Sequence, residues 1–155
     1  MNYKRLFFSL FFPQLAGWLG AIFTTSAIPV WYAALEKPSF SPPNWLFGPV
    51  WFLLYVLMGL SVYLIWQKAD RNQKARSAMG LFWIHLFFNF SWSYVFFGLK
   101  WIGLALVNIL LIWAFIVILM KKFSPIDKRA AYLLAPYFLW VSFATVLNAA
   151  IWWLN

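Results

Sequence analysis

The sequence predicts an all-α membrane protein, built as a five-transmembrane-helix bundle with a Pro-rich lid loop between helices 1 and 2. Its 155 residues are 65% hydrophobic and 10% charged, which is more apolar side chain than a soluble domain of this length can bury. Five apolar runs have the ~20 residues that a helix needs to cross a hydrocarbon core of about 30 Å. These runs are Leu6 to Leu35, Leu46 to Trp66, Ala78 to Leu99, Trp101 to Met120 and Ala130 to Leu154.

The charged residues support this count, because all 15 Asp, Glu, Lys and Arg side chains lie outside the runs or at their ends. A charge buried in lipid is costly and therefore rare within a span. The first run is the weakest, since Pro13 and Pro29 interrupt it and Lys4-Arg5 before a hydrophobic stretch also resembles a signal peptide. Its apolar character continues past the ~7–15 residues of a signal-peptide core, which favours a retained helix. No linker is long enough to separate two units, so residues 1–155 are predicted to form a single domain.

The formal charge of +9 could indicate a nucleic-acid partner, but the distribution of the charges has a simpler explanation. In a five-helix threading, ten basic residues fall on one side and only Lys37 and Lys100 on the other, which is a strong positive-inside signal. We therefore expect an integral protein of a bacterial cell membrane, with no nucleic-acid partner. The N-terminus should be cytoplasmic, the first loop and the C-terminus should lie on the opposite side, and anionic lipids should contact the basic loops. The ten are Lys4, Arg5, Lys68, Arg71, Lys74, Arg76, Lys121, Lys122, Lys128 and Arg129.

An irregular segment from Leu35 to Trp45 separates the first two runs and contains Pro38, Pro42 and Pro43. Unpaired peptide groups beside a membrane are tolerated only against protein or water. The segment is therefore interpreted as a lid over, or the mouth of, a cavity.

Three stripes of aromatic and polar side chains follow helical spacing and would face one another inside the bundle. Together they predict a cavity walled by indoles, a phenol and two amides, with Gly59 and Ala144 leaving space, which suits a flat and mostly apolar ligand. Packing and the interfacial aromatic belt remain the alternative explanation of the tryptophans. The stripes are Trp51, Tyr55 and Gly59; His85, Asn89, Trp92 and Phe96; and Trp140, Ala144, Asn148 and Ile151.

Conventional catalysis and metal binding are not expected. His85 is the sole histidine, cysteine is absent, and the three carboxylates, Glu36, Asp70 and Asp127, all lie in predicted loops. An acid/base pair, a catalytic triad and a metal-ligand set therefore lack their parts. A His85 that bonds a neighbouring carbonyl is favoured over a catalytic or ligating one.

Two features concern helix shape and packing. Pro136 within the last run should free a carbonyl and bend that helix. In the first run, the pairs Ala16/Gly20 and Gly17/Ala21 allow close helix approach, and packing within the bundle is favoured over a homodimer face.

The combination and order of several short motifs resemble the translocator protein family, whose bacterial members are called tryptophan-rich sensory proteins and whose animal members are called peripheral benzodiazepine receptors. The matching pieces extend from about Trp31 to the C-terminus. They are Trp31-Tyr32 with Leu35 to Pro43, Gly48-Pro49-Val50-Trp51, Asn89-Phe90-Ser91-Trp92-Ser93 with Phe96-Phe97-Gly98, and Pro136-Tyr137 with Trp140, Phe143-Ala144 and Leu147-Asn148.

The resemblance implies a five-helix bundle, often dimeric, whose first loop covers an aromatic pocket for porphyrins and for isoquinoline or benzodiazepine-type ligands. It suggests a membrane receptor or sensor for protoporphyrin IX or haem, bound as ligand and not as cofactor. Light-dependent porphyrin degradation through Trp51 and Trp140, and porphyrin transport, are the alternatives. The pocket residues that it implies are Tyr32, Pro42, Pro43, Trp51, Asn89, Trp92, Trp140 and Ala144.

One departure concerns sterols. Animal members carry a proposed cholesterol motif near the end of the last helix, in which a Tyr is followed closely by Lys or Arg. The segment from Leu147 to Asn155 contains neither residue type, so sterol recognition at that site is not expected.

Overall fold

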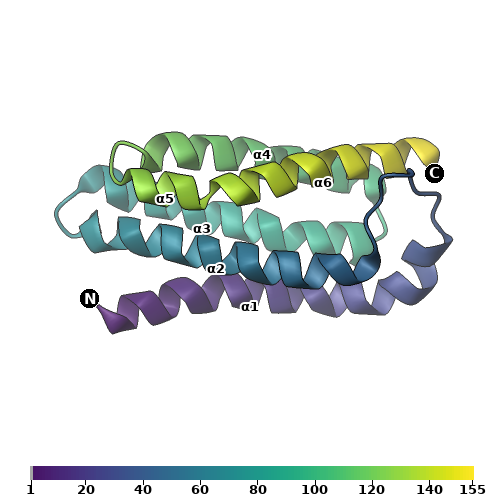
Figure 1. Ribbon diagram of the computed structural model, residues 1–155, viewed down its shortest axis with the longest axis horizontal. Helices are drawn as coiled ribbons and strands as arrows, with labels where there is room; N and C mark the ends of the chain where they lie inside the picture. The colour runs from purple at the N-terminus through teal and green to yellow at the C-terminus, as the bar shows by residue number, and fades with distance from the viewer. Residues whose placement is uncertain (1) are drawn as a thin grey trace.

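The computed structural model describes residues 2–155, which form helices that run side by side along one long axis (Figure 1). Two π-helical turns, η1 and η2, continue the first and third helices, and a short α5 precedes α6. The elements are α1 (Tyr3–Ala27), η1 (Ile28–Tyr32), α2 (Asn44–Ala69), α3 (Gln73–Ser93), η2 (Tyr94–Gly98), α4 (Ile102–Phe123), α5 (Lys128–Leu133) and α6 (Ala135–Leu154).

Four helical segments in the described part of the chain are long and apolar enough to cross a membrane: Tyr3–Tyr32, Asn44–Ala69, Ile102–Phe123 and Lys128–Leu154. The all-helical membrane class predicted from the sequence is therefore confirmed. The predicted fifth span, from Ala78 to Leu99, is not among the four. Its helix α3 packs against α1, α2 and α4 and turns buried polar side chains, His85 and Asn89, toward the inside of the bundle.

The last run, in which a bend at Pro136 is predicted, is divided into two helices in the structure. α5 ends at Leu133 and α6 starts at Ala135, so Pro136 lies in the first turn of a new helix. A proline there lacks only an N–H that has no partner within the helix. The short α5 is held to α2 by a hydrogen bond from the Ser61 hydroxyl to the Ala130 carbonyl at 2.7 Å.

One end of the bundle, called here the basic end, gathers the N-terminal residues, the α2–α3 connection and the α4–α5 connection (Figure 1). Helix starts there are capped by side chains that accept backbone N–H groups, as at Asn2, Asn72 and Asp127. Arg5 pairs with Asp70 at 2.7 Å, and Asp127 pairs with Lys68 at 3.2 Å and with Arg129 at 3.0 Å. All ten basic residues predicted to share one side belong to these segments.

Close packing of α1 on α2 extends from the basic end toward the middle of the bundle. A methyl group added to Gly59 would stand 2.6 Å from the Ser9 carbonyl oxygen and 3.0 Å from the Leu10 Cα atom. The expectation that Gly59 leaves space in a cavity is therefore wrong, because its missing side chain lets two helix backbones meet.

The opposite end, called here the loop end, holds the segment between η1 and α2, the α3–α4 connection and the C-terminal residues (Figure 1). Lys37 Nζ donates to the carbonyls of Tyr32 at 2.8 Å and Leu35 at 2.7 Å. Asn155 exchanges two hydrogen bonds of 3.0 Å with the backbone of Glu36. Side chains thus attach the loop to the end of the first helix and to the end of α6.

Candidate ligand-binding site

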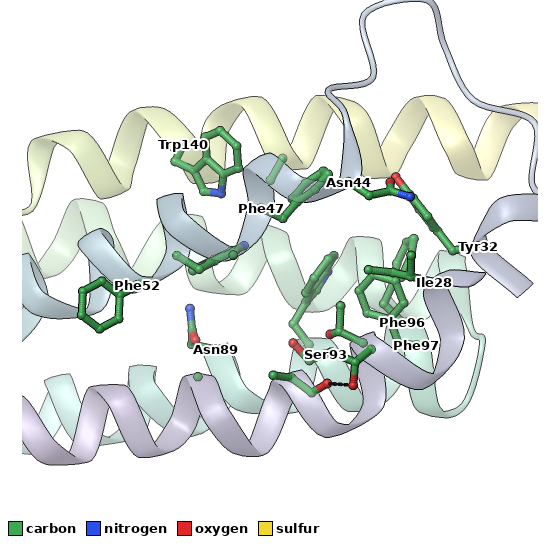
Figure 2. A pocket seen from close by; sticks show the side chains of 18 of the residues that line it. Ile28, Tyr32, Asn44, Phe47, Phe52, Asn89, Ser93, Phe96, Phe97 and Trp140 are labelled. Atoms are coloured by element: carbon green, nitrogen blue, oxygen red, sulfur yellow. Dashed lines mark hydrogen bonds between the residues drawn. The ribbon is translucent and has the colours of Figure 1, made fainter. Parts of the chain in front are cut away.

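A cavity of about 500 Å³ lies among α1, η1, α2, α3, η2 and α6 toward the loop end. Figure 2 shows Phe47 and Trp140 on one side of it and Ile28, Tyr32 and Phe96 at the end nearest the loop. Eleven of the residues that line it are aromatic. They are Trp18, Tyr32, Trp45, Phe47, Trp51, Phe52, Tyr55, Trp92, Phe96, Phe97 and Trp140.

The structure brings together six of the eight pocket residues predicted from the sequence. Tyr32, Trp51, Asn89, Trp92, Trp140 and Ala144 line the cavity, whereas Pro42 and Pro43 lie outside its lining. Pro43 is instead the residue that caps the start of α2. The fixed φ of proline suits a chain that is about to enter a helix, and the wall of the cavity begins one residue later, at Asn44.

The two amides expected to face a ligand are already engaged by protein groups. Asn148 accepts a hydrogen bond from Trp92 Nε1 at 3.1 Å and donates one to the Ile102 carbonyl at 3.1 Å. It therefore holds the Trp92 indole against the wall and ties α6 to α4. Asn89 accepts from the Tyr55 hydroxyl at 2.7 Å and donates to the Tyr137 hydroxyl at 2.7 Å.

Trp140 carries a donor without a protein acceptor. Its Nε1 atom is buried and has no hydrogen-bond partner among residues 2–155, and Figure 2 shows the ring on the cavity wall. A buried N–H that stays unpaired is unfavourable by about 1–3 kcal/mol. Because the atom is enclosed by protein atoms, an acceptor on a ligand can pair with it only after the indole ring or its neighbours move.

A chain of hydrogen bonds leads from the cavity into the bundle. Tyr55 and Asn89 line the cavity, and Tyr137 and His85 lie behind them with no exposed surface. His85 Nε2 is 2.8 Å from the Tyr137 hydroxyl oxygen. His85 therefore bonds a phenol, whereas the sequence favoured a neighbouring carbonyl as its partner.

Helix α1 contributes wall residues that the sequence reasoning missed, among them Gly17, Trp18, Ala21 and Thr24. Close approach predicted for the Gly17/Ala21 pair is present at Gly17, which lies against the ring of Tyr55 of α2, and both residues also border the cavity. The second pair does pack within the bundle, since Ala16 is buried and Gly20 lies against Ser93. Small residues every fourth position were the available signal, and it does not distinguish contact from space.

The cavity opens between α1 and α2. Three of its wall residues there are largely exposed, with exposed fractions of 60% for Trp18, 71% for Trp45 and 59% for Phe52. On the side of this opening nearer the basic end, Gln14 Nε2 donates a hydrogen bond to the Phe52 carbonyl at 3.0 Å and thereby joins α1 to α2. Both helices belong to segments apolar enough to span a membrane, so the opening faces the region that lipid chains would occupy.

The sequence is similar to proteins of one known family along almost its whole length. A model of the TspO/MBR family matches residues 9–154. The chain is 41% identical to the tryptophan-rich protein TspO of Archaeoglobus fulgidus, over 100% of this chain and 99% of the relative. It is 40% identical to the tryptophan-rich protein TspO of Chlorobaculum tepidum, over 90% and 88% of the two chains, and 38% identical to the human translocator protein, over 90% and 83%. A helical membrane bundle with this match along almost its whole length belongs to the TspO/MBR family.

Proposed function

We propose that this protein is a membrane receptor or sensor that binds porphyrins, protoporphyrin IX above all, in the aromatic cavity at the loop end. The observation that carries the proposal is the cavity itself. Its volume of about 500 Å³ is in the range of sites for drug-sized ligands, and its wall combines many aromatic faces with few free polar groups. Such a wall suits a flat, conjugated ligand, including isoquinoline and benzodiazepine-type compounds.

The indole N–H of Trp140 supports a ligand with a polar edge. Trp140 lines the cavity, and its enclosed N–H lacks a protein partner among the described residues, so a small turn of the ring would let it donate to an acceptor on the ligand. A porphyrin with propionate side chains offers aromatic faces for Trp51 and Trp92 and a carboxylate for this donor.

The binding experiment is a titration of the protein in lipid nanodiscs with protoporphyrin IX, followed by quenching of tryptophan fluorescence. Trp51→Phe and Trp140→Phe should each weaken binding, because the first reduces stacking area and the second also removes the free donor. Trp113→Phe is the matched control, since Trp113 lies outside the cavity and donates to Ser142 at 2.9 Å. Unchanged affinity in both cavity variants would remove these residues from the site.

A second candidate function is light-dependent degradation of the bound porphyrin, with a cavity tryptophan as electron donor. The arrangement around Trp51 favours it, because the ring of Trp51 stacks on that of Tyr55 with centroids 5.5 Å apart and lies edge-on to Tyr137 at 6.2 Å. A Trp51 oxidised by an excited porphyrin therefore has two phenols beside it. Illuminated wild type should lose the porphyrin spectrum faster than a Trp51→Phe variant saturated with ligand, whereas equal decay with and without protein would rule the activity out.

We also propose that α3 crosses the membrane as a fifth span, with the basic end in the cytoplasm. Its length, its packing among three apolar helices and the gathering of ten basic residues at one end support this topology. A cysteine introduced at Ser39 of this cysteine-free chain reports on the loop. Membrane-impermeant thiol reagents should label it in intact cells, and labelling only after the membrane is breached would reverse the topology.

A further inference from the structure

We propose that Tyr137 and His85 form a redox pair that receives the oxidising equivalent from Trp51, so that Tyr137 becomes a neutral tyrosyl radical when the bound porphyrin is excited by light. This inference rests on the porphyrin-binding and photochemical functions proposed above. It adds an electron donor and a proton acceptor that lie outside the cavity wall.

The directions of the hydrogen bonds single out Tyr137. Its oxygen accepts a hydrogen bond from Asn89 Nδ2 at 2.7 Å, and its other polar neighbour is His85 Nε2 at 2.8 Å, where the imidazole tautomer decides which atom donates. We assign His85 the neutral imidazole with its proton on Nδ1, which lets Nε2 accept from the Tyr137 hydroxyl; Nδ1 is buried and has no partner among residues 2–155. The phenol proton thus already lies on the path to a base.

The two buried tyrosines of α2, Tyr55 and Tyr63, lack such a base. The Tyr55 hydroxyl donates a hydrogen bond to the amide oxygen of Asn89 at 2.7 Å. A neutral amide is a far weaker base than an imidazole. Tyr63 is buried in the same helix as Tyr55, and its hydroxyl has no partner among residues 2–155. Removing an electron from a phenol makes its proton strongly acidic, so oxidation is easiest where a base waits at hydrogen-bond distance. His85 is the sole histidine of the chain. Among the tyrosines of residues 2–155, Tyr137 alone is hydrogen-bonded to it.

The excited porphyrin takes one electron from Trp51, which gives a porphyrin radical anion and a Trp51 radical cation. Tyr137 then gives one electron to Trp51 across their edge-on contact of 6.2 Å, and its phenolic proton moves to His85 Nε2. The products are neutral Trp51, the Tyr137 phenoxyl radical and the His85 imidazolium. Dioxygen dissolved in the bilayer takes the extra electron from the porphyrin radical anion and becomes superoxide.

Burial makes this pair suited to holding the oxidising equivalent. Neither Tyr137 nor His85 has exposed surface, so the proton cannot escape to water and remains available for return. Asn89 keeps its hydrogen bond to the phenoxyl oxygen throughout. Trp51 is meanwhile restored, which protects the indole from attack by oxygen between one excitation and the next.

The experiment uses the full chain in lipid nanodiscs with bound protoporphyrin IX, illuminated in the presence of oxygen and frozen for electron paramagnetic resonance. Wild type should give a tyrosyl signal that changes shape when ring-deuterated tyrosine is incorporated. In Tyr137→Phe the signal should be lost, and mass spectrometry should find more oxidised Trp51. Tyr63→Phe is the matched control and should keep the signal.

A second variant covers the case in which Tyr137→Phe does not fold. His85→Gln keeps a hydrogen-bonding side chain beside Tyr137 but removes the base, so it should bind porphyrin normally and lose the tyrosyl signal. A wild-type signal in porphyrin-bound Tyr137→Phe or His85→Gln would overturn the proposal, as would wild-type bleaching without any tyrosyl signal. Absence of fluorescence quenching, or of bleaching in the wild type, would instead show that the proposed binding or photochemistry has failed, and this inference with it.

Discussion

The two ends of the bundle are built from the same apolar helices but differ in how those helices are held and packed. At the basic end, caps and ion pairs hold the helix starts, and Gly59 lets α1 and α2 meet backbone to backbone. At the loop end the α-helical hydrogen bonding gives way to π-helical turns at Ile28–Tyr32 and Tyr94–Gly98, and a cavity opens between helices. π-Helical turns are frequent at functional sites. The caps and ion pairs thus lie at the basic end, and the cavity proposed to bind ligand lies at the loop end.

The largest expected effect tests the tight contact that extends from the basic end. Gly59→Ala should lower the free energy of unfolding by about 2–3 kcal/mol, because the added methyl meets backbone atoms that cannot rotate away. Gly80→Ala is the matched control, since a methyl there meets nothing within 4 Å and alanine is the better helix former. Thermal unfolding in detergent measures both variants. Equal stability of the two would show that the helices do not meet at Gly59.

At the loop end, the same substitution should act on binding. Gly17→Ala places a methyl against the ring of Tyr55, which its hydrogen bond to Asn89 holds in place, so the methyl or the displaced ring must occupy cavity space. We expect protoporphyrin affinity to fall about tenfold, or about 1.4 kcal/mol. Gly48→Ala also borders the cavity but meets nothing within 4 Å, and it should bind as the wild type does. Fluorescence titration that finds equal affinities would contradict the assigned wall.

The ion pairs of the basic end provide a smaller, pH-dependent test. Hydrogen bonding from the Arg129 side chain, the largest cause, and contact with Lys68 outweigh burial and hold the pKa of Asp127 well below its ordinary value of 3.8. Because the folded-state pKa is lowered, the stabilisation is complete above about pH 4 and is lost as the pH falls further.

Asp127→Asn keeps a capping side chain but loses these pairs, and it should lower stability at pH 7 by about 0.5–1 kcal/mol. Its deficit relative to the wild type should shrink as the pH falls below 4. Asp70→Asn serves for comparison, because the Asp70 side chain is 67% exposed and that of Asp127 only 6%. Chemical denaturation at pH 7 and pH 3 measures both, and a larger loss for Asp70→Asn would reverse the ranking.

The smallest effect concerns the connection between η2 and α4 at the loop end. Lys100 has a φ of 60°, a left-handed conformation that is unfavourable for a residue with a side chain. Lys100→Gly should therefore raise the unfolding free energy by less than about 1 kcal/mol, because glycine's greater freedom when unfolded offsets part of the gain. Leu99→Gly, at a φ of −83°, should lower it. A loss of stability in Lys100→Gly would contradict the backbone assigned here.

Hydropathy and charge predict the helices well because apolar and charged side chains have very different free energies in water and in lipid. The stripes through Trp51, Asn89 and Trp140 do converge on one cavity, as predicted. The contribution of α1 could not be found in the same way. In a membrane bundle the lipid-facing and inward-facing surfaces are equally apolar, so the pattern does not fix the rotation of a helix. Gly17 is predicted to pack and Gly59 to leave space, yet Gly17 also borders the cavity and Gly59 closes a helix contact.

For the proposed porphyrin ligand, the opening between α1 and α2, with Trp18, Trp45 and Phe52 at its rim, would make the bilayer the reservoir from which the ligand is drawn. Occupancy then depends on how strongly a compound partitions into lipid as well as on its contacts in the cavity. Two compounds with equal contacts can differ in apparent affinity by the ratio of their partition coefficients. A dissociation constant expressed per volume of water therefore changes with the amount of lipid or detergent in the sample, whereas one expressed as mole fraction in the membrane does not.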